Sequence, residues 1–379
     1  MAVLNEEQQM LKDMAADWAR ERMPVTALRA LYDHGGGGRA EALGYDPDAW
    51  AEMAQMGWTG IVAPLEHGGS DFGCMGLGLV LEQLGRTLAA SPLLSSALIA
   101  VSALRLGGNA AQQARWLPGL ADGSVIGTLA VEEGPHHAPE RTALVATPAG
   151  DGWTLNGIKR PVQDGMIAHL AIVAARVEGV PGDRDGLRLI LVPTDAPGLT
   201  REPLDQIDAR RPATFTLTNV AVGADALLGG ADLLDQLLDR AAIGMAAEML
   251  GIADQAFDTT LDYLKARVQF GAIIGSFQAL QHRAADLFGE LQLARSAVEA
   301  ALVAIDNDDP ALPRLASLAK AIVGETVHAI SQQMVQLHGG IGMTHEHDAG
   351  LYLKRARVAA QCYGSTAWHR ERWARLNGY

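Results

Sequence analysis

The spacing of hydrophobic positions changes twice along the 379-residue chain. Up to residue 120, apolar residues recur three and four positions apart, as on one buried face of a helix. Between residues 126 and 220 the apolar runs are short or alternating, and Gly, Pro and Asp separate them, which is typical of strands and turns. Helical spacing returns at residue 234. The pattern therefore predicts helices, then a small β domain, then helices again.

The predicted elements fall into three domains: an N-terminal helical domain over 1–122, a middle β domain over 123–231 and a C-terminal helical bundle over 232–379. Helices are expected over 6–23, 46–56, 75–85, 93–106, 110–120, 234–267, 280–304, 312–336, 345–361 and 367–376. Strands are expected over 126–131, 143–147, 153–158, 167–174, 187–193 and 214–220. Asn156-Gly157 is expected at a hairpin turn, and Gly244 and Gly251 at positions of close helix packing.

Charge and cysteine content narrow the possible partners. The formal charge is −14 and the pI is near 5.2, which argues against nucleic acid and anionic membranes as partners. Two cysteines, Cys74 and Cys362, cannot build a disulfide framework or a zinc site, and a reducing cytoplasm is the expected location. Residues 345–348 (H-E-H-D) lack the H-E-x-x-H spacing, so no metal site is expected.

One stretch, residues 267–286, carries the most specific signal: R-V-Q-F-G-A-I-I-G-S-F-Q-A-L-Q-H-R-A-A-D. Periodicity alone indicates a helix end, a glycine turn and a new helix. The full string resembles the flavin-site motif of the acyl-CoA dehydrogenase family, R-x-x-F-G-x-x-[IL]-x-x-[FH]-Q-x-x-x-H-x-x-A-D. The matching positions are Arg267, Phe270, Gly271, Gln278, His282, Ala285 and Asp286.

Further strings extend the resemblance over essentially the whole chain. Residues 336–342 (Q-L-H-G-G-I-G) resemble the family's Q-x-x-G-G-x-G loop, and residues 152–159 (G-W-T-L-N-G-I-K) resemble a string of its middle domain. The resemblance implies a helical domain, a middle antiparallel β-barrel, a C-terminal four-helix bundle and bound FAD. It assigns Arg267 to the pyrophosphate, a role that suits a guanidinium. The other implied cofactor residues are Phe270, Gln278, Gln336, Gly339, Gly340, Ser365 and Thr366.

The family's catalytic base is missing from the matching positions. Most members carry Glu in a Y-E-G-T string, and here Tyr363 or Gly364 stands in its place, depending on the alignment. Other members carry the base in the helix before the flavin motif, where this chain has Ala241. Asp239 and Glu248 lie nearby on that helix and are weak candidates, because each is expected to have a structural role.

The middle domain departs from the family as well. The family string [YF]-C-x-T-E, whose Thr touches the flavin ring, corresponds here to residues 129–133 (L-A-V-E-E). The ring-covering string K-x-W-[IV]-[TS] corresponds to residues 159–163 (K-R-P-V-Q). Flavin binding by this chain alone is therefore an open question.

The resemblance implies α,β-dehydrogenation of an acyl-CoA thioester, with electrons passed to an electron-transfer flavoprotein-like acceptor. The departures resemble the small-subunit branch of two-gene dehydrogenases for dicarboxylyl-CoA or steroid-CoA esters, which form α2β2 tetramers with a paralogous subunit. Two alternatives remain: a base-lacking, non-catalytic or half-site subunit, and a different flavin or CoA reaction that uses Tyr363. The sequence does not identify the acyl chain, or decide between a homo-oligomer and a heterotetramer.

Overall fold

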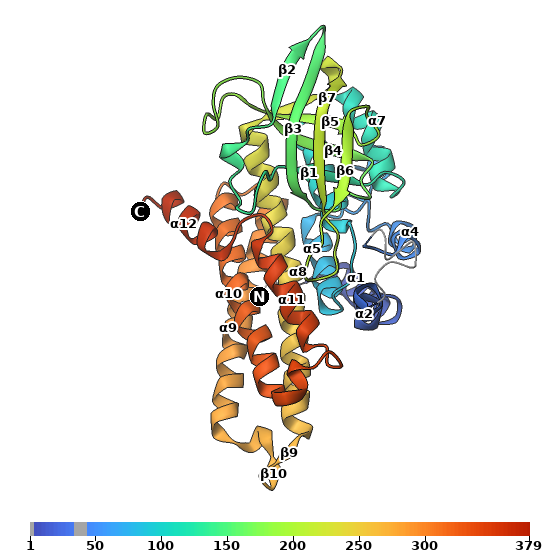
Figure 1. Ribbon diagram of the computed structural model, residues 1–379. Coiled ribbons are helices and arrows are strands. Elements are labelled where there is room, and N and C mark those ends of the chain that lie inside the picture. The colour runs from blue at the N-terminus through green and yellow to red at the C-terminus, as the bar shows by residue number, and fades with distance from the viewer. Residues whose placement is uncertain (1–3, 34–43) are drawn as a thin grey trace. The chain divides into compact units, whose positions relative to one another are not determined.

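The computed structural model describes residues 4–33 and 44–379. Its contacts divide the chain into two compact units. The first, the bundle unit, combines the start of the chain with Gly78–Ala89 and Ala242–Tyr379. The second, the sheet unit, contains Ala90–Ala241 and the segment that ends at Leu77. Segments far apart in sequence therefore build each unit (Figure 1).

The sheet unit contains a strongly twisted sheet of eight strands among the described residues. These are β1 (Gly127–Ala130), β2 (Val145–Ala149), β3 (Gly152–Val162), β4 (Leu170–Arg176), β5 (Leu187–Pro193), β6 (Leu199–Pro203), β7 (Ala213–Val222) and β8 (Leu227–Gly230). The order is β6-β7-β3-β2-β4-β5-β8, and β1 pairs with β4. Most pairs are antiparallel as expected, but β1 and β2 each run parallel to β4. Every residue of β4 is buried, which explains its apolar sequence from Leu170 to Ala175; only the last residue, Arg176, is charged.

The expected hairpin turn at Asn156-Gly157 is wrong. Both residues lie inside β3, which pairs with β2 as far as Asn156 and with β7 along most of its length. The turn falls instead at Gly150 and Asp151, where Gly150 has a positive φ of 62°. Gly157 is needed for a close approach, because a Cβ there would lie 2.9 Å from the Leu144 backbone.

Short helices complete the sheet unit: α4 (Pro47–Gln55), a π-helical segment (Leu94–Ala100), α6 (Val101–Gly107) and α7 (Ala110–Ala121). The α4 helix begins at Asp46, whose carboxylate accepts from the backbone N–H groups of the first turn. The α7 helix begins with a capping box between Asn109 and Gln112. The Ser96 hydroxyl accepts a 3.2 Å hydrogen bond from the Gly127 backbone N–H, which ties the π-helical segment to β1.

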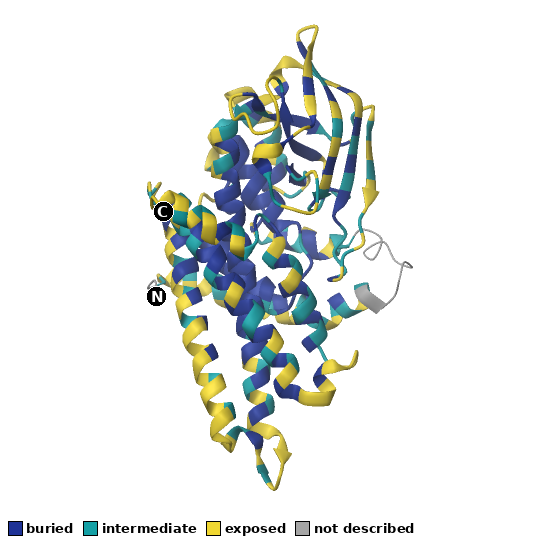
Figure 2. Cartoon of the chain, turned by 60° about the vertical axis from the view of Figure 1, so that its left-hand side comes forward, coloured by how far each residue is buried: buried dark blue, intermediate teal, exposed yellow. Residues whose placement is uncertain are grey.

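The bundle unit contains most or all of each remaining helix: α1 (Glu6–Arg22), α2 (Val25–Asp33), α5 (Cys74–Arg86), α8 (Ala231–Ala266), α9 (Gln278–Asp306), α10 (Leu312–His338), α11 (Ala349–Gln361) and α12 (Thr366–Leu376). Gly251 of α8 lets α5 approach closely, as expected, because a Cβ there would lie 1.8 Å from the Glu82 carbonyl oxygen. Figure 2 shows buried positions along the inner faces of the long helices and exposed positions at their hairpin tip. No helix among the described residues is both long and apolar enough to cross a membrane.

Candidate functional site: two nucleotide-motif segments and the Tyr363 turn

The motif beginning at Arg267 forms a two-stranded hairpin between α8 and α9, which we call the tip hairpin (Val268–Gln269 and Ala272–Ile273). Phe270 and Gly271 form its turn, both with positive φ. The Phe270 side chain is 92% exposed and meets Phe277 edge-to-face, with ring centroids 6.2 Å apart. Among the described residues, the exposed Arg267 guanidinium has no hydrogen-bond or ion-pair partner. The tip hairpin thus presents an aromatic ring and a cation to solvent.

The second motif forms a glycine loop (Gly339–Met343) directly after α10. Gly339 has φ +64°, and a Cβ at Gly339 or Gly340 would meet no atom within 4 Å. Gln336, in the last turn of α10, is exposed. Bare backbone beside open space suits close approach of a nucleotide.

The two motifs, about 60 residues apart in sequence, meet at one end of the bundle unit. The Tyr263 hydroxyl donates a 3.3 Å hydrogen bond to the His338 carbonyl, and the two rings lie 4.3 Å apart. Leu264, Ile274 and Leu337 form a small core between the segments. Gln278, the first residue of α9, is exposed beside the tip hairpin. The bundle unit therefore brings together the residues expected at the nucleotide.

The string that lacks the base forms a tight turn over residues 362–365, here called the Tyr363 turn. Tyr363 has φ +56° and Gly364 has φ +102°. A Cβ at Gly364 would lie 2.7 Å from His369 Nε2, so a glutamate at this position would require the turn to move. Tyr363, which is half-buried, is the position of the turn that can carry a large side chain in place of the family's carboxylate.

Ser365 and Thr366 have structural contacts at the start of α12. The Ser365 hydroxyl accepts from the Trp368 backbone N–H at 3.3 Å and caps the helix. Thr366 Oγ1 lies so close to α10 that a Cβ at Gly324 would be 2.3 Å from it. Their expected role at a cofactor remains a prediction.

The candidate bases on α8 lie in different surroundings. Glu248 is buried, and its Oε1 accepts from Nε of the equally buried Arg355 at 2.8 Å. This buried ion pair favours a structural role for Glu248, because the guanidinium already engages one oxygen of its carboxylate. Asp239 is buried in the part of α8 that belongs to the sheet unit, and Ala241 is buried there as well.

In the sheet unit, the two carboxylates of the 129–133 string already have partners. Glu132 Oε1 lies 2.5 Å from Nδ1 of His137, whose side chain is buried. Glu133 accepts from the Leu144 backbone N–H at 2.9 Å and from the Lys159 ammonium at 2.7 Å. Burial lowers the pKa of Lys159 to about 8. Where the family places a threonine against the flavin ring, this chain has the Glu132–His137 pair.

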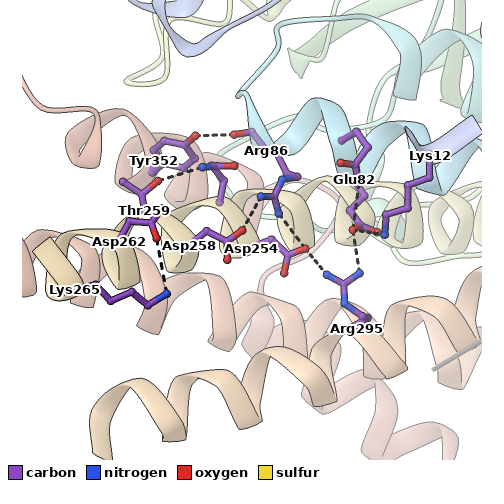
Figure 3. A network of polar contacts seen from close by, with 12 residues as sticks. Lys12, Glu82, Arg86, Asp254, Asp258, Thr259, Asp262, Lys265, Arg295 and Tyr352 are labelled. Carbon is purple, nitrogen blue, oxygen red and sulfur yellow. Dashed lines mark hydrogen bonds and ion pairs between the residues drawn. The ribbon is translucent and has the colours of Figure 1, made fainter. Parts of the chain in front are cut away.

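Sequence analysis missed a network of charged side chains that crosses the bundle unit (Figure 3). Glu82 of α5 pairs with Lys12 at 3.1 Å and with Arg295 at 3.0 Å, and Arg295 also pairs with Asp254. Burial alone would raise the pKa of Glu82, but Arg295 and Lys12 outweigh burial and hold it below its usual value. Burial raises the pKa of Asp254, and the nearby Glu82 adds to that rise against the opposing effect of Arg295.

Two further charged or titratable residues contact the Tyr363 turn directly; the sequence placed the second, His369, near the missing base with packing as its expected role, and it missed the first. They are Lys320 of α10 and His369 of α12, both almost fully buried. The available signal was the position of Lys320 within the apolar run 315–323, where an unpaired charge would be costly. Within 4–33 and 44–379, no cluster of three or more His, Cys, Asp or Glu side chains could hold a metal ion.

Comparison with known proteins finds similarity over nearly the whole chain. The family models for the acyl-CoA dehydrogenase N-terminal, middle and C-terminal domains match residues 5–124, 134–220 and 229–376. The acyl-CoA dehydrogenase IpdE2 of Mycolicibacterium smegmatis is 33% identical over 95% of this chain and 96% of its own.

Two solved structures of complexes are also similar over nearly their full length. The Tcur3481–Tcur3483 steroid ACAD, solved as a variant, matches at a TM-score of 0.88 with 31% identity, over 98% of each chain. The ChsE4–ChsE5 complex from Mycobacterium tuberculosis matches at a TM-score of 0.89 with 25% identity, over 100% of each chain. The predicted fold class is confirmed.

Proposed function

Since this chain belongs to the FAD-dependent acyl-CoA dehydrogenase family, we propose that it acts in the α,β-dehydrogenation of an acyl-CoA thioester, as a subunit whose catalytic base comes from a paralogous partner. The observation that carries this proposal is the Tyr363 turn, which contains no carboxylate side chain and in which a Cβ at Gly364 would lie 2.7 Å from His369 Nε2. The chain belongs to a family of oxidoreductases, and our proposal concerns which subunit supplies the catalytic base.

The nucleotide end of the site supports a role in holding FAD. Arg267, Phe270 and Gln278 are exposed at the tip hairpin, and Gly339 and Gly340 offer bare backbone at the same end of the bundle unit. Cations and open backbone suit the pyrophosphate and the nucleotide of FAD. Bound FAD would supply the acceptor for the β-hydrogen as a hydride.

The ring end fits less well. The Glu132–His137 pair stands where the family threonine would touch the flavin ring, and Pro161 stands where the covering tryptophan would be. We infer that this chain shares flavin sites with its partner and contributes mainly nucleotide contacts. The two similar structures described above are complexes of two named chains, which supports a heteromeric assembly with this chain as one member.

Co-expression with a paralogous subunit that carries the Y-E-G-T glutamate tests the proposal. We expect a heteromer that retains flavin absorbance, oxidises CoA esters, including a steroid-CoA ester, and passes electrons to a flavoprotein acceptor. The chain expressed alone should be inactive and bind little flavin. A yellow, fully active homo-oligomer made from this chain alone would overturn the proposal.

Matched arginine variants test the nucleotide end. Arg267→Gln should lower the flavin content of the heteromer, because it removes the cation assigned to the pyrophosphate. Arg283→Gln, a change of the same charge at an exposed position of α9 that the motif leaves open, should leave flavin content unchanged. Equal flavin loss in both variants would argue against a specific role for Arg267.

A further inference from the structure

The buried Lys320 side chain binds three backbone carbonyls near the Tyr363 turn. Its ammonium donates to the carbonyl oxygens of Ala359 at 3.3 Å, Ala360 at 3.1 Å and Gly364 at 3.0 Å. The residue is 1% exposed, and among the described residues no carboxylate pairs with it. A buried ammonium is costly unless its three N–H donors are satisfied, and here three carbonyls satisfy them. The buried ammonium of Lys320 therefore holds the backbone of Ala359, Ala360 and Gly364 in place.

The three carbonyls belong to two different structures that Lys320 joins. Ala359 and Ala360 lie in the last turn of α11, whose carbonyls have no partners within the helix. A cation at the C-terminal end of a helix is also favourable for the helix dipole. Gly364 lies in the Tyr363 turn that follows. Lys320 therefore fixes the turn to the end of the helix before it.

A second side chain holds the same turn from the other side. His369 of α12 is buried, and its Nε2 donates to the Tyr363 carbonyl at 2.9 Å. Between these contacts, Tyr363 keeps a φ of +56°, a conformation that is strained for a bulky residue. Strain of this kind persists only where the surroundings over-determine the backbone. Lys320 and His369 supply that constraint.

We propose that Lys320 is a positioning residue of the acyl-CoA site: by binding the Gly364 carbonyl and the end of α11, it fixes the direction of the Tyr363 side chain. The role of the turn in dehydrogenation rests on the proposed function above, but the clamping of the turn does not. Lys320 acts only through the turn and does not itself contact the substrate.

The test is hydrogen exchange of the full chain, measured by mass spectrometry over residues 359–366. Lys320→Met keeps an unbranched side chain and removes all three donors, so exchange in the turn should rise about tenfold or more. The matched control is Ile330→Ala, which truncates a buried side chain of the same helix beside Leu287 and Met334. It should lower thermal stability without raising exchange in the turn selectively.

Kinetics of the heteromer give the second readout. Lys320→Met should lower kcat by about tenfold or more while KM for the CoA ester changes less, because a misplaced turn costs orientation rather than binding. Lys320→Gln keeps two donors, so it should restore part of the protection and part of kcat. If Lys320→Met does not accumulate as folded protein, Lys320→Gln compared with the unaltered chain provides the same test, with smaller changes expected.

The outcomes separate this inference from the proposed function. If hydrogen exchange over residues 359–366 is unchanged in Lys320→Met, the inference that Lys320 holds the turn is wrong. Raised exchange with unchanged kcat would overturn its role in positioning. If the assembled heteromer oxidises no CoA ester, the proposed function fails, and exchange still decides whether Lys320 holds the turn.

Discussion

Replacing Arg295 by Met should destabilise the bundle unit far more than removing a surface arginine. Arg295 lies between two buried carboxylates, Glu82 and Asp254, whose side chains are 6% and 11% exposed. Breaking a buried pair by removing one partner costs about 3–5 kcal/mol, because an uncompensated charge remains. In the variant Lys12 still pairs with Glu82, and Arg86 still lies 3.6 Å from Asp254, so we expect a loss near the lower end, about 3 kcal/mol. For a chain of 379 residues, with an unfolding entropy of about 2.1 cal/mol/K per residue, the melting temperature should then fall by roughly 4 °C.

The loss should depend on pH in a definite direction. In the unaltered chain the lowered pKa of Glu82 contributes stability above the unfolded value of 4.5 that is lost as pH falls, and the raised pKa of Asp254 has the opposite effect. Without Arg295 the effect of burial is opposed only by Lys12 at Glu82 and by Arg86 at Asp254, so the pKa of each carboxyl group rises from its value in the unaltered chain. The penalty is therefore largest at neutral pH and shrinks as pH falls through the carboxyl pKa values, because protonation removes the buried negative charges that Arg295 compensated.

Thermal melts at about pH 7.5 and about pH 4.5 measure both effects, since these values bracket the titration of carboxylates. The matched control is Arg20→Met, which breaks an ion pair with Asp17 in which both side chains are 69% exposed, and it should change stability by only about 0–0.5 kcal/mol. A loss below about 1 kcal/mol for Arg295→Met at neutral pH would refute the reasoning, as would an equal loss at both pH values.

Three further predictions concern a buried ion pair, the glycines of two long helices and the glycine of the Tyr363 turn. Arg355→Leu should cost about 3–5 kcal/mol, because it removes the buried guanidinium that pairs with the buried Glu248, and adding Glu248→Leu should recover much of that loss; a double variant no more stable than Arg355→Leu would argue against a buried-charge penalty. Gly251→Ala should lower the melting temperature, because its Cβ would lie 1.8 Å from a backbone carbonyl, whereas Gly289→Ala, with no atom within 4 Å, should gain roughly 0.5–1 kcal/mol. Gly364→Ala should cost about 1–3 kcal/mol because of its φ of +102°, and an unchanged melting temperature would contradict this.

The sequence predicted the sheet well where burial alone decides the pattern, and poorly where pairing decides it. The strand β5, Leu187–Pro193, which is apolar apart from Arg188, was predicted with its observed bounds. Asn156-Gly157 was misplaced because its turn-like composition serves a close contact inside a long strand, which only the pairing with β2 and β7 reveals. The strands Leu199–Pro203 and Leu227–Gly230 were missed, because they are short and four of the five β6 side chains are polar or Pro.

The candidate site divides in the same way. Local strings identified the tip hairpin and the glycine loop, because glycine spacing and an arginine at a helix end are features of sequence. The contact that joins them, from the Tyr263 hydroxyl to the His338 carbonyl, is tertiary and was not predictable. The ion pair of Glu248 with Arg355 spans more than one hundred residues of sequence, so the environment of that candidate base was equally hidden.

The Tyr363 turn combines features that are unfavourable for folding, through desolvation or backbone strain. A turn that only connects two helices has no need of a buried ammonium, a buried imidazole and a tyrosine at φ +56°. Each of these features opposes folding on its own, through desolvation or strain, and together they define one backbone shape. That shape is kept although the turn has no carboxylate to present. We infer that the turn orients the Tyr363 side chain in the acyl-CoA site, while the partner subunit supplies the catalytic base.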